Sequence, residues 1–277
     1  ILEQKSAQLQ VVGQIDNIAP TEDIRSARFM GDKGYIVTFK KTDPLFVLDL
    51  SDPYQPTIAG ELKIPGFSTY IHRIDDDHLL TIGYDQGIML QIFDVSDMTD
   101  PMLTYREVIG TRDSTSEAAT NHLAFNYFKG LLAIPMTICE MDDNFQEDMM
   151  TFNGLLVYDI NVETGFDYLG SVSHVAPESQ ECYYVLELGR GSFPYVKRSI
   201  FMDDYVFSIT EDTIKVNQLS AILPMENGWR SPAVYLYTLP CAHHPQTFAQ
   251  PVTISSRVPS MFHAWQWQAL SITRLCP

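Results

Sequence analysis

A short motif occurs four times along the chain, and its spacing limits the possible folds more than any other feature. Each copy is a run of apolar, β-branched or aromatic residues that reaches a polar anchor just before a turn. The anchors are Asp49, Asp94, Asp159 and Asn217, which lie 45, 65 and 58 residues apart. A repeat unit of about 40–50 residues is typical of a four-stranded propeller blade. The sequence therefore predicts an all-β fold, a β-propeller or partial propeller of about four four-stranded antiparallel blades.

The first repeat shows the internal order most clearly. Its runs are Arg25–Phe29, Tyr35–Phe39, Leu45–Asp49 and Thr57–Leu62, separated by Gly, Asp and Pro. Short β-branched and aromatic runs between such turn residues are typical of successive antiparallel strands. No helical period of 3.6 residues competes with this pattern. Because the strands are mostly apolar, we expect them to be buried on both faces, as in sheets that stack around an axis.

The repeats also predict which strand lies innermost in each blade. Residues 25–30, 69–74, 121–126 and 197–202 begin the same strand order in the four repeats. We therefore expect these segments to be the first, innermost strands of four consecutive sheets.

The start of the chain resembles the end of a repeat. Val12–Ile15 matches Ala59–Leu62, so the chain should begin with the outermost strand of a preceding blade. This strand could complete the last blade and close a small ring. An open arc cut from a larger ring fits equally well.

Residues 1–220 carry the blade pattern, whereas residues 221–277 do not. The second segment holds four charged residues, all three tryptophans and seven of the sixteen prolines. It is a divergent blade, a flexible extension or an out-of-frame translation, and its composition favours the last two.

Charge argues against nucleic acid as a partner, and hydropathy gives no transmembrane span. The formal net charge is −17, and the 18 Lys and Arg residues are scattered, which disfavours nucleic acid because its phosphates would be repelled. No window holds the 18 or so apolar residues of a transmembrane span, and no signal peptide is visible. The chain opens on Ile1, so it is either processed or a piece of a longer protein.

Four cysteines without a Cys-x-x-Cys spacing make a zinc site unexpected. Cys139 follows the second strand of the third repeat, and Cys182 lies in the connection to the fourth. Adjacent blades could bring the two together, and a bridge requires Cα atoms within about 7 Å.

The stretches Ser26–Pro53 and Gly60–His72 resemble those of secreted bacterial and archaeal proteins with a C-terminal β-propeller domain, distantly related to the WD-repeat propellers. The resemblance covers roughly residues 9 to 220. It implies a propeller exported to the cell surface or the extracellular space, and it supplies no catalytic residue. Two departures stand out. The family's third blade typically begins with an Asp-His pair, whereas this chain has Asn121 and His122, and the match stops after Leu219.

Four basic residues form the candidate ligand site. His72, His122 and Arg198 occupy similar positions on the predicted first strands, and Arg28 lies nearby in the first repeat. Because first strands line the central channel of a propeller, these side chains could converge on an anionic or metal-bound ligand. The alternative is that each one bonds to local carbonyl groups.

A second candidate is the acidic loop after Cys139. Its oxygen ligands are of the kind that calcium prefers, and they are Asp142, Asp143, Asn144 and Glu147. The loop lacks the Gly and the terminal Glu spacing of an EF-hand, so a solvated acidic loop is the simpler interpretation. No other cofactor is predicted.

The repeated Asp49, Asp94 and Asp159 have a structural interpretation, because a carboxylate before a turn accepts hydrogen bonds from turn amides. Ser192 lacks the Gly-x-Ser-x-Gly elbow of a hydrolase. Without a catalytic constellation, the sequence favours a non-catalytic extracellular module that binds a protein, a glycan or a small ligand through its blade loops. The alternative is a secreted hydrolase or lyase with its site at the channel mouth, around His72, His122 and Arg198.

Overall fold

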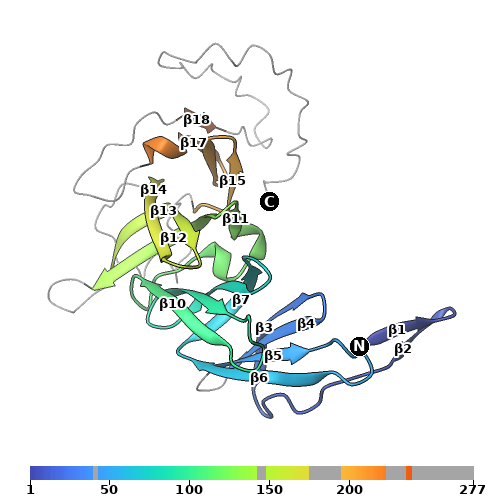
Figure 1. Cartoon of the computed structure of the whole chain (residues 1–277). Helices are drawn as coiled ribbons and strands as arrows, with labels where there is room; N and C mark the ends of the chain where they lie inside the picture. Colours follow the sequence, from blue (N-terminus) through green and yellow to red (C-terminus); the bar gives the residue numbers. More distant parts are fainter. Residues whose placement is uncertain (40–42, 142–147, 175–194, 223–234, 239–277) are drawn as a thin grey trace.

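The computed structural model describes residues 1–39, 43–141, 148–174, 195–222 and 235–238. Most of the regular structure in them is β-strand, in four four-stranded antiparallel sheets and one two-stranded hairpin. This arrangement confirms the prediction of an all-β fold built from four-stranded blades. Figure 1 shows the sheets following one another along an open arc, with the hairpin projecting from the first of them.

Each sheet keeps its four strands in chain order. The hairpin is β1 (Leu2–Lys5) and β2 (Gln8–Val11). The first sheet is β3 (Asp23–Met30), β4 (Lys33–Phe39), β5 (Asp43–Asp49) and β6 (Thr57–Ile64). The second is β7 (Phe67–Arg73), β8 (His78–Tyr84), β9 (Ile88–Asp94) and β10 (Met102–Ile109). The third is β11 (Asn126–Phe128), β12 (Leu131–Met141), β13 (Asp148–Asn161) and β14 (Gly165–Ser173). The fourth is β15 (Arg198–Met202), β16 (Tyr205–Ile209), β17 (Thr213–Gln218) and β18 (Tyr235–Thr238).

One backbone hydrogen bond recurs in all four sheets and sets their common register. An amide at the end of the third strand, or just after it, donates to a carbonyl in the turn between the first two strands, at 2.7–2.8 Å. The pairs are Leu50 to Asp32, Val95 to Asp77, Ile160 to Gly130 and Leu219 to Asp204. Asp49, Asp94 and Asp159 are therefore equivalent, as the sequence indicates. In the fourth sheet the equivalent residue is Gln218, one residue beyond the predicted anchor Asn217.

Apolar side chains on facing sheets form the core. We call the face that each sheet turns toward the next sheet in the chain its trailing face, and the opposite face its leading face. Tyr35 and Val37, on the trailing face of the first sheet, pack with Ile71 and Leu79 of the second. Similar clusters join the second sheet to the third and the third to the fourth. Successive residues of a strand point to opposite faces of the sheet. A central strand whose sheet packs against a neighbour on each face must therefore be apolar throughout.

The predicted first strand over residues 121–126 is wrong. Residues His122–Ala124 form a 3-10 helix, η2, and the strand begins only at Asn126. The reason is local, because the Asn121 side chain accepts a hydrogen bond from the amide of Leu123 and caps the helix. A second 3-10 helix, η1 (Glu117–Ala119), precedes it, and a third, η3 (Leu219–Ala221), follows β17.

Both ends of the blade pattern differ in detail from the expectation. Residues 12–15 form no strand, yet Gly13 lies against the backbone of Pro53 just as Gly60 lies against that of Met98. The outermost segment of a preceding blade is therefore in place beside the first sheet. At the other end, β18 pairs with β17 and adds a fourth strand where we expected the pattern to stop. Most of the predicted tail, residues 223–234 and 239–277, lies outside the described residues.

Cys139, in the buried part of β12, is disulfide-bonded. Cys182, the partner that the sequence suggests, lies outside the described residues, so that pairing stays a prediction.

Gly60 offers a test of how closely successive sheets approach. A Cβ at this position would clash with the backbone oxygen of Met98, whereas a Cβ at Gly34 would meet the ring of Phe29 and the Leu48 side chain at 3.2–3.3 Å. We expect Gly60→Ala to lower the free energy of unfolding by about 1–3 kcal/mol, because backbone must move to make room. Gly34→Ala should cost less, since the exposed Phe29 ring can shift. Chemical denaturation of both variants measures the difference, and equal losses would contradict the proposed contact.

Candidate ligand-binding site on the first strands

The common register shows which candidate residues occupy the same place. In each sheet one residue at the end of the first strand pairs across the turn with the start of the second strand. The residue two positions before it is, in the order of the sheets, Arg28, His72, Asn126 and Ile200. Arg28 and His72 are thus equivalent, whereas the sequence predicts similar positions for His72, His122 and Arg198, with Arg28 nearby. His122 and Arg198 lie four and two residues before this position. Asn126 went unrecognised because the helix η2 displaces the start of its strand.

His72 lies among aromatic rings at the joint between the second and third sheets. Its ring centroid is 5.4 Å from that of Phe125 and 5.0 Å from that of Tyr127. The Tyr70 hydroxyl is 3.2 Å from His72 Nδ1, and the Tyr70 ring stacks at 6.4 Å on His122. We call these five residues the His72 cluster. The structure therefore brings two of the predicted histidines together, linked through Tyr70.

Arg28 supplies positive charge from the neighbouring first strand, because β3 and β7 are in contact. Its side chain is half-buried, and its Nε atom is buried without a hydrogen-bond partner. Burial, and to a lesser extent the positive charge of Arg28, lowers the pKa of His72 from 6.5 to about 4. At neutral pH the imidazole is therefore neutral, and Arg28 is the fixed cation.

The chemistry of this arrangement suits an anion next to a ring or an apolar group. When the Tyr70 hydroxyl donates to Nδ1, the neutral imidazole carries its proton on Nε2 and can donate there. The Arg28 guanidinium adds donors in a fork that matches a carboxylate or a phosphate. The aromatic rings offer apolar faces beside these donors.

The Arg198 side chain points away from the third sheet. Ser199, its neighbour on β15, is buried and accepts a hydrogen bond from Asn126 of the third sheet. Because side chains alternate along a strand, the exposed Arg198 side chain lies on the opposite face. The structure thus links His72 to Arg28 through its charge and to His122 through Tyr70, whereas Arg198 lies on the face of the fourth sheet that points away from the third.

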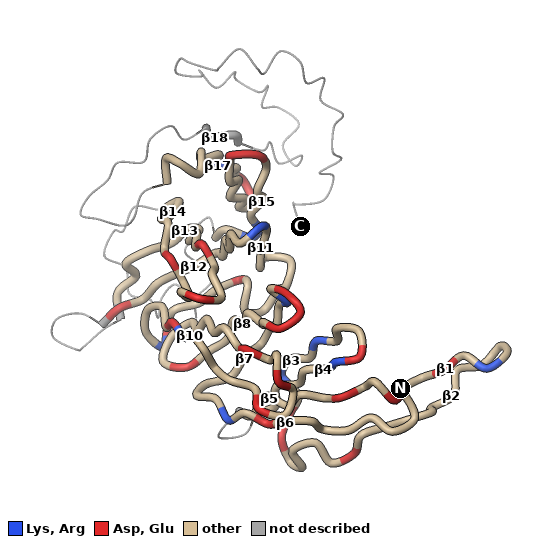
Figure 2. Tube along the Cα trace, in the orientation of Figure 1, with Lys and Arg blue, Asp and Glu red and all other residues tan. Residues whose placement is uncertain are grey.

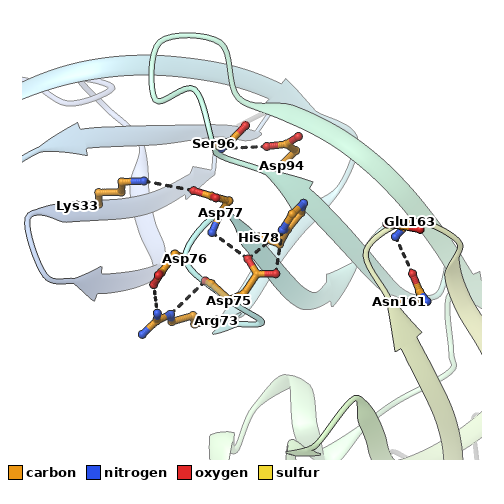
Figure 3. A network of polar contacts seen from close by, with 10 residues as sticks. All are labelled: Lys33, Arg73, Asp75, Asp76, Asp77, His78, Asp94, Ser96, Asn161 and Glu163. Atoms are coloured by element: carbon orange, nitrogen blue, oxygen red, sulfur yellow. Dashed lines mark hydrogen bonds and ion pairs between the residues drawn. The ribbon is translucent and has the colours of Figure 1, made fainter.

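The repeated anchors have the structural role that the sequence suggests in two sheets. The amides of Ser51 and Ser96 each donate to the carboxylate two residues earlier at 2.9 Å. Hydrogen bonds from the side chains of these serines, and then those from their amides, lower the pKa of Asp49 and Asp94. In the third sheet Asn161, two residues after Asp159, accepts a bond of the same kind, from the amide of Glu163 at 2.7 Å (Figure 3).

Acidic residues gather in the turns of the sheets (Figure 2). The turn between β7 and β8 holds Asp75, Asp76 and Asp77, which contact His78, Arg73 and Lys33 respectively (Figure 3). Within the described ranges, no group of three or more His, Cys, Asp or Glu residues could hold a metal ion. The candidate calcium ligands, Asp142, Asp143, Asn144 and Glu147, lie outside those ranges.

The environment of His72 predicts how stability changes with pH. Its folded pKa of about 4 lies below the ordinary value of 6.5, so the unfolded chain takes up a proton first as the pH falls. The stability that the neutral imidazole contributes should be lost between pH 6.5 and about 4. We expect the Tm of His72→Gln to fall less than that of the parent across this range, measured by thermal unfolding. His174, whose pKa burial lowers to about 3, and Asp49 and Asp94, whose pKa hydrogen bonds lower, remain in both proteins and contribute to the residual slope. If the Tm of the two proteins fell equally with pH, His72 would not be buried as described.

Comparison with known proteins places these features in a family. The family model "Beta propeller domain" matches residues 1–222. An uncharacterized protein of Archaeoglobus fulgidus is 48% identical over 126 residues, which is 45% of this chain and 20% of that protein. An uncharacterized protein of Methanocaldococcus jannaschii is 47% identical over 95 residues, covering 34% of this chain and 15% of the relative. The matched regions thus span a fifth or less of these relatives.

A solved structure, that of BamB from Moraxella catarrhalis, is similar at a TM-score of 0.37 and 11% identity, covering 69% of this chain and 47% of that one. In the part of the chain that the structure describes, no helix is long and apolar enough to cross a membrane. The match over residues 1–222, together with four repeated four-stranded sheets, shows that the chain belongs to the β-propeller domain family.

Proposed function

We propose that the chain is a non-catalytic extracellular binding module that holds a small carboxylate or phosphate ligand against Arg28 and the His72 cluster. The observation that carries the proposal is the buried Arg28 Nε, which has no hydrogen-bond partner and lies near a neutral imidazole. A buried donor without a partner costs free energy, about 1–3 kcal/mol. An acceptor on a ligand would recover that cost.

The aromatic rings narrow the class of ligand further. Tyr70 and Phe125, with ring centroids 5.0 Å apart, provide flat apolar surface beside the donors. A carboxylate carried on a sugar ring or another compact ring would place its charge at Arg28 and its body on these rings. A larger partner, a protein or a glycan, could present such a group from its surface and contact the blade loops as well.

The disulfide at Cys139 supports an extracellular location, because disulfides persist mainly in oxidising compartments. The sequence resemblance to exported propellers agrees with this location.

The hydrolase alternative draws little support from the best nucleophile–base pair in the described residues. Ser208 Oγ lies 2.6 Å from His174 Nε2, which is hydrogen-bond distance for a serine and its base. Ser208 is fully buried at the joint between the third and fourth sheets, so no substrate reaches its hydroxyl. The pair therefore suits a structural bond between sheets.

Isothermal titration with phosphate, citrate and galacturonate tests the proposal. We expect at least one of these anions to bind the parent protein, and Arg28→Gln to weaken that binding at least about tenfold, because a charged hydrogen bond is worth about 1.5–3 kcal/mol. Tyr70→Ala should weaken galacturonate more than phosphate, since only the sugar covers the ring.

Arg198→Gln is the matched control, because it removes the same charge from an exposed side chain that points elsewhere. It should leave the affinity within about twofold of the parent. An equal loss of affinity in Arg28→Gln and Arg198→Gln would show that only the net charge of the protein matters, not a site at Arg28. The absence of binding heat with all three anions would contradict the proposed ligand class.

A further inference from the structure

The third sheet begins differently from the two before it, because two 3-10 helices replace the start of its first strand. Strand β11 has three residues, whereas β3 has eight and β7 has seven. The helices η1 and η2 lie between β10 and β11 in the chain. The second sheet continues as a strand through His72, whereas at the same joint the third sheet presents a turn.

Helix η1 is fixed in the core between the second and third sheets. Ala118 and Ala119 are buried, and both belong to the apolar cluster that joins these sheets. The buried Ser116 hydroxyl donates a hydrogen bond to the carbonyl of Pro135 on β12 at 2.6 Å and accepts one from the amide of Ala118. The segment that leads into η2 is therefore held firmly in place.

Asn121 connects this anchor to η2. Its amide donates to the Glu117 carbonyl at 2.8 Å, and its side-chain oxygen accepts from the amide of Leu123 at 3.1 Å. The last residue of η2, Ala124, is fully buried in the same core as η1. Because the turn is fixed on both sides, its exposed side chains, those of His122 and Leu123, have a defined place.

The His122 ring lies on the ring that positions His72. It stacks on Tyr70 with centroids 6.4 Å apart and planes 25° apart, and the Tyr70 hydroxyl is 3.2 Å from His72 Nδ1. The ring nitrogens of His122 make no hydrogen bond to any other residue that the structure describes. A stack at this distance is offset, so the imidazole does not cover the whole Tyr70 face. A ring bound on Tyr70 would lie beside these nitrogens, which can bond hydroxyl groups.

We propose that η2 makes the site selective for a hydroxylated ring that carries a carboxylate. Asn121 is a positioning residue that holds His122 beside Tyr70, and His122 bonds the hydroxyl groups of the ring. The carboxylate lies at Arg28, as in the proposed function, on which this inference rests. A free phosphate reaches the Arg28 donors without extending over Tyr70, so it gains nothing from His122.

Isothermal titration of galacturonate and phosphate into the parent and three variants tests the selectivity. We expect His122→Ala and Asn121→Ala each to weaken galacturonate binding about three- to tenfold, the loss that goes with one neutral hydrogen bond. Phosphate binding should stay within about twofold of the parent. Asn121→Ser is the matched control, because serine keeps a capping oxygen, and it should bind both anions within about twofold of the parent. Far-UV circular dichroism checks that all variants fold.

The place of His122 can also be followed without a ligand. The stacked Tyr70 ring shifts the NMR signals of the His122 ring protons. We expect Asn121→Ala to move these signals toward those of a histidine in an unfolded peptide, and Asn121→Ser to leave them close to their parent positions. Unchanged signals in Asn121→Ala would overturn the positioning role of Asn121.

The titration separates the selectivity from the anion site itself. A parent that binds phosphate but not galacturonate, or an unchanged ratio of the two affinities in His122→Ala, would overturn the selectivity and leave the anion site standing. An equal loss of both ligands in Asn121→Ala would show that Asn121 has a structural role only. If galacturonate, phosphate and citrate all failed to bind the parent, the proposed function would fall and the selectivity with it.

Discussion

Face-to-face packing of apolar sheet faces is the interaction on which the rest of the structure depends. A single four-stranded sheet cannot bury its own faces, so each one here is stabilised by its neighbours. Leu79 and Phe93 on one side of the second sheet, and Leu80 and Ile92 on the other, are fully buried in two different cores. At about 1.5–3 kcal/mol per buried side chain, such joints dominate the stability of the fold.

The same constraint explains where the candidate site lies. Central strands serve two apolar joints and have no room for charge, whereas a first strand at the edge of its sheet can carry polar groups. Arg28 and His72 occupy equivalent positions on two such strands, near enough for the charge of one to shift the pKa of the other. Burial at the joint between the second and third sheets keeps His72 neutral. The site is thus a product of sheet packing rather than of a dedicated loop.

The repeat pattern predicts the sheets well, because strand periodicity, turn residues and Asp anchors all reflect local physics. Asp49 and Asp94 cap their turns as the pattern indicates. Local capping by Asn121, which replaces the start of a strand with a 3-10 helix, leaves no signal in strand periodicity. The direction of Arg198 depends on which neighbour is buried against the adjacent sheet, and that is tertiary information. The aromatic residues around His72 read as core residues in the sequence, so their role beside a candidate site went unrecognised.

The central claim is that sheet packing brings Arg28 close to a buried, neutral His72. The pKa of the His72 imidazole, measured by NMR titration in the parent and in Arg28→Gln, tests this most directly. The parent value should be about 4, and removal of the Arg28 charge should raise it while burial still holds it below 6.5. A parent value near 6.5, or the same value in both proteins, would contradict the account.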